Sequence, residues 1–169
     1  MAQVSTEEPP GSTGGPRRDG RPPRTLALQG LVNRLVRGLL RAPGISRGIG
    51  RRLVALHVVG RRSGQHFEVP VAYTRHEGDL LVGTPFAWGR NLRSGEPVQL
   101  RFKGELRTAD VRVITDESGV VEHYALLAAD NHNFARFNGI GLDPDGRPAP
   151  EDLHRAWSGG ARVIRLTLR

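Results

Sequence analysis

The chain has 169 residues, a length that suits one domain with a tail, and 37% of them are hydrophobic, which suffices for a buried core. Cysteine is absent, so disulfides, thiolate nucleophiles and cysteine-ligated metal sites are excluded. The net charge is +8, and there are nine arginines without a single acid from Arg24 to Arg62. We expect an anionic partner to meet this part of the chain, with a solvated basic face as the alternative.

The N-terminal part divides into a tail and a helix. Residues 1–24 are rich in proline, glycine, serine and threonine, and we expect a disordered tail because they offer little apolar surface to offset the cost of ordering. From Thr25 to Leu40, apolar residues recur at steps of three and four, which predicts an amphipathic helix. We expect this helix to pack within a single domain of residues 25–169, with peripheral contact to a membrane surface as the alternative.

Five short strands are expected in the centre of the chain. The first, from Leu53 to Val59, is mostly apolar, which suits a strand buried on both faces. The second alternates from Phe67 to Thr74, and Pro70 within it indicates a sheet edge or a bulge. The other three are expected at residues 80–83, 98–103 and 106–114, with turns at 76–79 and 103–105.

The last third predicts helices and a closing strand. Asp116 or Ser118 could cap a helix that ends near Asn131, and an irregular stretch with a short helix at 150–157 follows. A strand at 163–168 brings the number to about six. The expected fold class is therefore α+β, a small antiparallel β-barrel with peripheral helices. The chain has no run of 18 apolar residues, and we expect a cytoplasmic protein.

Two segments carry candidate chemistry. The first is the turn at 60–64, in which Arg61, Arg62 and Ser63 stand between two glycines. Such a turn can cradle an anion, although an ordinary basic hairpin has the same composition. The second is the loop at 84–93, where Trp88 could cover a planar ring while Arg90 and Asn91 donate to an anionic chain. The alternative interpretation makes Trp88 and Leu92 core anchors of a short helix.

The histidines give no metal motif. None of the six stands at a metal-ligand spacing with a nearby carboxylate, and we expect no metal site.

Together, the turn at 60–64, the strand that contains Pro70 and the Trp88-x-x-Asn91-Leu92 loop resemble the deazaflavin-dependent nitroreductase family. Members of this family are split β-barrels that bind coenzyme F420 and are related to the barrels that bind flavin mononucleotide. The likeness covers about residues 26–115. It implies an antiparallel split β-barrel for this chain, with coenzyme F420 as the cofactor and flavin mononucleotide as the second choice.

The resemblance also implies a set of cofactor contacts. By position, Arg61, Arg62 and Ser63 would meet the phosphodiester or the acidic tail of the cofactor. The deazaflavin ring would lie beside the strand after the turn, the loop before the tryptophan would offer backbone donors, and the tryptophan loop would close the site. The residues concerned are, in chain order, Pro70, Val71 and Ala72, then Gly83, Thr84 and Pro85, then Trp88, Arg90 and Asn91.

The function implied is hydride transfer from the reduced deazaflavin to a quinone, a nitro compound or a similar conjugated electrophile, with the cofactor as the reactive group. Catalytic side chains stay unassigned; Tyr73 or Tyr124 could donate a proton, but a packing role is the favoured interpretation of each. The loop before Trp88 is shorter than is common in the family, which favours a non-catalytic flavin- or deazaflavin-binding protein as the alternative. Charge alone suggests a nucleic-acid-binding barrel, but aromatic residues make up only 5%, and we expect no nucleic-acid partner. A homodimer is a further expectation from the resemblance.

Overall fold

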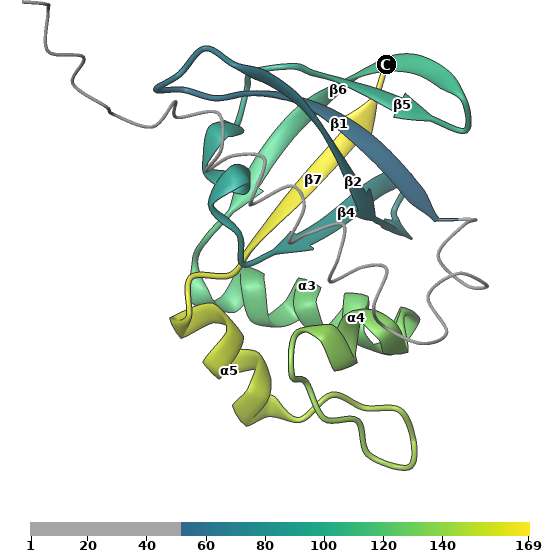
Figure 1. Ribbon diagram of the computed structural model, residues 1–169. Coiled ribbons are helices and arrows are strands. Elements are labelled where there is room, and N and C mark those ends of the chain that lie inside the picture. The colour runs from purple at the N-terminus through teal and green to yellow at the C-terminus, as the bar shows by residue number, and fades with distance from the viewer. Residues whose placement is uncertain (1–51) are drawn as a thin grey trace, which may run out of the picture.

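The computed structural model describes residues 52–169, and in this part the chain forms a curled antiparallel sheet with helices gathered at one end (Figure 1). The fold class is α+β, as the sequence predicts. The sheet has seven strands: β1 (Leu53–Val59), β2 (His66–Ala72), β3 (Thr74–His76), β4 (Asp79–Thr84), β5 (Val98–Phe102), β6 (Glu105–Ile114) and β7 (Arg162–Leu168). The helices are the 3-10 helix η2 (Ala87–Asn91) and the α-helices α3 (Glu117–Asp130), α4 (His132–Phe137) and α5 (Pro150–Ser158).

The strand order shows how the sheet curls into a half-barrel. Across the sheet the order is β2-β1-β5-β6-β7-β4-β3, with every neighbouring pair antiparallel. Strands β2 and β3 therefore form opposite edges, yet only Tyr73 separates them in the chain. Because consecutive Cα atoms lie about 3.8 Å apart, the two edges must come together at this residue. The backbone N–H of Tyr73 donates to the carbonyl of Arg52 at 3.0 Å, which fixes the corner.

This corner corrects the expected strand from Phe67 to Thr74. The chain changes strand at Tyr73, and the sheet has seven strands instead of about six. Thr74 is buried, not solvent-facing as the alternation indicated, because its hydroxyl donates to Asp130 at 2.7 Å. The expectation for Pro70 is confirmed, since β2 is an edge strand.

Two tight hairpins follow from residues that tolerate left-handed backbone. The β3–β4 turn places Glu77 at φ 50° and Gly78 at φ 87°, and the β5–β6 turn repeats these values at Lys103 and Gly104. Two successive residues with positive φ are the signature of the type I′ turn, whose twist matches that of paired strands. Both turns lie where the sequence places them.

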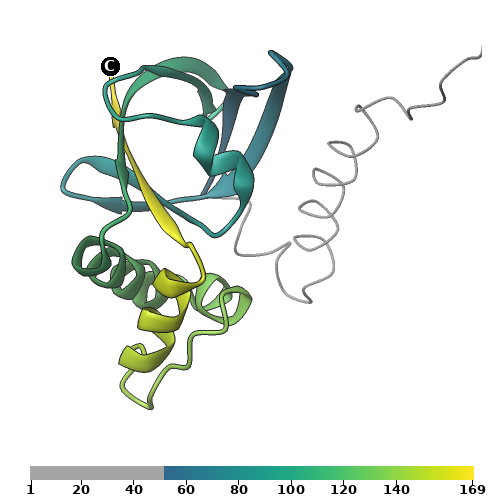
Figure 2. The same cartoon turned by 90° about the vertical axis from the view of Figure 1, so that its left-hand side faces the viewer.

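The core has two parts, one inside the curled sheet and one between the sheet and the helices. The interior part is lined by alternating residues of the strands, with Leu56, Leu100 and Ile164 fully buried. The second part packs β4 and β7 against α3, α4 and α5 (Figure 2). No β1 residue belongs to this second part among the described residues, so β1 is fully buried on one face and half-buried on the other, contrary to the expectation of two buried faces.

The helical end of the molecule begins with the cap that the sequence predicts. The Asp116 carboxylate accepts from the backbone N–H of Gly119 at 2.9 Å and starts α3. The prediction of an irregular stretch directly after α3 is wrong, because α4 begins at His132. Asn131 ends α3, and its side-chain oxygen accepts from the N–H groups of Asn133 and Phe134, which starts α4. The short helix at 150–157 and the closing strand are confirmed as α5 and β7.

The expected tail and the amphipathic helix from Thr25 to Leu40 lie outside the described residues. Within residues 52–169, no helix combines the length and the hydropathy needed to cross a membrane.

A buried ion pair between strands makes a first testable prediction. Burial alone would raise the pKa of the Asp79 carboxyl, but hydrogen bonds from Arg165 and Thr167 outweigh it and hold the pKa below its usual value. Such a group stabilises the fold above its unfolded-state pKa of about 3.9, and the contribution is lost as the pH falls through the lower folded-state value. We expect Asp79→Asn to cost about 2 kcal/mol at pH 7, because the pair is mostly but not fully buried. Urea unfolding from pH 7 to 3 should show the gap between variant and parent closing below about pH 4; a gap of constant size would contradict the assignment.

Candidate functional site

The turn between β1 and β2 presents two arginines at its tip. The N–H of Gly60 donates to the carbonyl of Gln65 at 2.8 Å, and the N–H of Gly64 donates back to Gly60 at 2.7 Å. A Cβ at Gly60 would lie 2.5 Å from the Ser63 hydroxyl, so a larger residue there would require the exposed Ser63 side chain to move. Arg61, Arg62 and Ser63 are all exposed.

The tryptophan loop folds into η2 and covers one end of the sheet interior. The N–H of Phe86 donates to the Thr84 hydroxyl at 3.1 Å, which turns the chain out of β4 and into the helix. Trp88 is only 3% exposed and lies in the interior part of the core, with Leu92 packed against the same cluster. Trp88 is therefore a core residue, as the second of the two interpretations has it, and its ring presents no face to solvent.

The structure brings the two sequence motifs together. The backbone N–H of Arg61 donates to the side-chain oxygen of Asn91 at 3.2 Å, and the Arg61 guanidinium donates to the carbonyl of Arg90 at 3.0 Å. We call the group of Arg61, Arg62, Arg90 and Asn91 the arginine junction. Within residues 52–169, no carboxylate forms an ion pair with any of its three arginines. The junction is thus a positively charged surface on which an anion would meet little competition.

The residues expected beside the cofactor ring are spread more widely. In β2, Val71 points into the core, while Pro70 and Ala72 are half-buried and alternate to its other face, toward the strand end away from the turn. Thr84 lies close to the junction, because a Cβ on Gly89 would come within 2.8 Å of its methyl group. Pro85, the next residue, is exposed.

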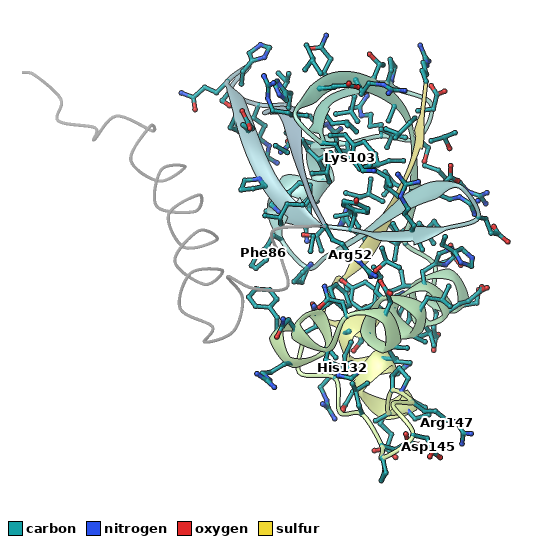
Figure 3. All side chains as sticks on the ribbon, turned by 90° about the vertical axis from the view of Figure 1, so that its right-hand side faces the viewer. Arg52, Phe86, Lys103, His132, Asp145 and Arg147 are labelled. Atoms are coloured by element: carbon teal, nitrogen blue, oxygen red, sulfur yellow. The ribbon has the colours of Figure 1, made fainter. Side chains whose placement is uncertain are left out.

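Gly83 is covered by the helices on one side and is paired with β7 within the sheet. A Cβ on Gly83 would lie 2.6 Å from the ring of Phe134 and 2.9 Å from Leu127, so α3 and α4 rest directly on its backbone. Its partner in the register is Val163 of β7. Phe86, one residue before η2, lies at the boundary between sheet and helices, with its ring 6.0 Å from that of Phe137 (Figure 3).

Both tyrosines considered as proton donors are buried. Tyr73 is 5% exposed and packs edge-on against Phe102 at 5.5 Å between ring centroids. Tyr124 is fully buried, and burial raises the pKa of its hydroxyl, so the proton is held tightly at neutral pH.

One residue at this end of the sheet was missed by the sequence reasoning. Arg162, the first residue of β7, lies opposite Thr84, and a Cβ on Gly89 would come within 3.1 Å of its side chain. Burial lowers the pKa of Arg162, and the neighbouring charge of Arg90 lowers it further. A signal was present in the sequence, because the alternation of Ile164 and Leu166 predicts that position 162 shares their inward face.

No group of three or more His, Asp or Glu side chains within the described part of the chain is arranged to hold a metal ion.

Comparisons with known proteins give little to set beside this geometry. No family model matches the chain, and no curated protein matches it. Several solved structures match. One of them, described as a domain-swapped dimer, is 13% identical, covers 84% of this chain and 98% of its own length, and has a TM-score of 0.44.

Proposed function

We propose that this protein is an oxidoreductase that binds reduced coenzyme F420 and passes its hydride to a quinone, a nitro compound or a similar conjugated electrophile. The observation that carries the proposal is the arginine junction. Two motifs 30 residues apart, each suggestive of an anion contact, meet through the hydrogen bonds of Arg61 to Asn91 and to the Arg90 carbonyl. This juxtaposition is what a cofactor with a phosphodiester and an acidic tail requires.

The residues of this chain suit the acidic end of the cofactor better than its ring. Arg61, Arg62 and Arg90 are exposed and lack a carboxylate partner within the described residues. Of the two residues that adjoin the junction, Pro85 is exposed and available to border the ring, whereas Thr84 is buried. Pro70 and Ala72 keep their place in the proposal as a half-buried apolar surface on edge strand β2, farther from the turn. When bound, the cofactor supplies the hydride, and the protein binds and orients it.

A second candidate is a protein that binds a flavin or deazaflavin without turning over a substrate. Two observations favour it: Trp88 is buried, and Phe134 and Leu127 cover Gly83, so fewer groups are left to line a ring and a substrate beside it. Flavin mononucleotide is the second choice of cofactor in either case. A homodimer and contact of the N-terminal segment with a membrane surface are further parts of the proposal.

The test is a titration of the full chain with oxidised coenzyme F420 and, separately, with flavin mononucleotide, followed by cofactor fluorescence. We expect saturable binding of the deazaflavin that Arg61→Ala with Arg90→Gln removes; Trp88 is left intact because its replacement would disturb the core. Consumption of the reduced deazaflavin by a panel of quinones and nitro compounds then separates the two candidates. Binding without turnover supports the carrier, and binding of neither cofactor contradicts both.

A further inference from the structure

A half-buried arginine without an acidic partner among the described residues stands at the end of the sheet that η2 borders. The Nε atom of Arg162 is inaccessible to solvent and has no hydrogen-bond partner among the described residues. Within residues 52–169 no carboxylate forms an ion pair with it, and its pKa is lowered by burial and by the neighbouring charge of Arg90. A half-buried cation beside a second cation is unfavourable, because burial removes water from the charge and nothing of opposite sign replaces it.

The buried Nε atom is a donor that a ligand could satisfy. Buried polar atoms are nearly always hydrogen-bonded in folded proteins, so the Nε–H group of Arg162 favours an acceptor at this place. The second positive charge nearby, on Arg90, favours an acceptor that is negatively charged. An anion with several acceptor oxygens supplies both the hydrogen bond and the opposite charge.

The side chain of Arg162 lies against the backbone of η2. Gly89 has no side chain, and a Cβ there would come within 3.1 Å of Cδ and 3.7 Å of Cγ of Arg162. The stem of Arg162 therefore lies across this glycine, with Thr84 on the neighbouring strand opposite. Arg90, the next residue along η2, is exposed and gives the site an open side.

We propose that Arg162 and Arg90 form a binding site for a phosphate or carboxylate anion at the end of the sheet covered by η2. Arg162 supplies the buried part of the site, and Arg90 supplies the solvent-facing part. The site shares Arg90 with the arginine junction and extends it inward. Its existence does not depend on the identity of the cofactor, since an anionic substrate group and a cofactor phosphate offer the same acceptors.

The experiment observes the unpartnered atom directly. Arginine Nε–Hε cross peaks of the ¹⁵N-labelled full chain are followed during titration with inorganic phosphate at constant ionic strength, with chloride as the balancing anion. Arg162→Lys, which keeps the charge but removes the Nε donor, identifies the peak. We expect a saturable shift of the Arg162 peak and an affinity about tenfold lower in Arg162→Lys.

The matched control is Arg147→Lys, which makes the same substitution at an exposed arginine paired with Asp145. Figure 3 places both of these residues at the end of the helical layer farthest from the sheet. This control should bind phosphate as the parent does. An Arg162 peak that stays unmoved at saturating phosphate, or equal affinities in the parent and Arg162→Lys, would overturn the proposal.

Two further arms identify the source of the anion. If coenzyme F420 moves the Arg162 peak and a deazaflavin riboside without the phosphate and glutamates does not, the site holds the tail of the cofactor. If phosphate moves the peak and no deazaflavin binds at all, the anion site stands while the proposed oxidoreductase function fails.

Discussion

Replacing Arg61 with alanine is expected to weaken deazaflavin binding by about 10- to 100-fold. A hydrogen bond to a charged group contributes about 1.5–3 kcal/mol, and each 1.4 kcal/mol is a factor of about ten in affinity. Arg61 has two roles that the substitution affects differently. Its guanidinium supplies the charge and holds the Arg90 carbonyl, whereas its backbone N–H, which holds Asn91, is unchanged by alanine. The turn should therefore stay docked, and the loss should be one of charge.

Two variants separate charge from docking in a fluorescence titration at several salt concentrations. Asn91→Ala removes the acceptor of the Arg61 N–H and leaves all three arginines in place, so we expect a smaller loss with an unchanged salt dependence. Arg147→Ala removes a distant charge and should leave affinity as in the parent. If Arg61→Ala binds like the parent while Arg162→Lys does not, the acidic tail lies at the end of the sheet and the arginine junction is not its site.

Hydrophobic periodicity was sufficient to place most of the strands. In β2, Val69 and Val71 alternate with polar or half-buried residues, and in β5 Val98, Leu100 and Phe102 do the same, so each strand was identified with its buried face. Short turns with Gly78 and Gly104 required positive φ and could be read locally. Local signals of this kind depend only on residues a few positions apart.

What the sequence left open depends on contacts between distant residues. Thr74 is buried because Asp130, 56 residues later, accepts its hydrogen bond, and nothing near position 74 indicates this. The change of strand at Tyr73 follows from the position of β3 at the opposite edge of the sheet, which the alternation does not encode.

The candidate site divides in the same way. The composition of the turn at 60–64 and of the loop at 84–93 marked Arg61, Arg90 and Asn91, and the hydrogen bonds between the two segments bring these residues together. Arg162 was not predicted as a site residue because the chain has 24 arginines and no local motif distinguishes this one. Its position on the inward face of β7 is what distinguishes it, and this position indicates a site only when the location of η2 against Arg162 is known.

Gly83→Ala is expected to destabilise the fold by about 2 kcal/mol, although alanine is intrinsically the better strand residue by about 0.5–1 kcal/mol. The reason is steric: the added Cβ would lie 2.6 and 2.8 Å from two ring atoms of Phe134 and 2.9 Å from Leu127. To relieve the overlap, the Phe134 ring must leave its position 5.1 Å from the ring of Tyr124, and α4 must move with it. Gly83→Val should cost more, since the branched side chain adds two further methyl groups to the same space.

A double-mutant cycle with Phe134→Ala tests this explanation by urea unfolding. Removing the ring leaves room for the new Cβ, so the double variant should be more stable than the sum of the single effects by about 1 kcal/mol or more. The same variants measure the cofactor role of Gly83, because a methyl group that faces the helices leaves the opposite side of β4 unchanged. If Gly83→Ala folds as stably as the parent but no longer binds the deazaflavin, the glycine lines the ring after all, and the contact with Phe134 is not what requires it.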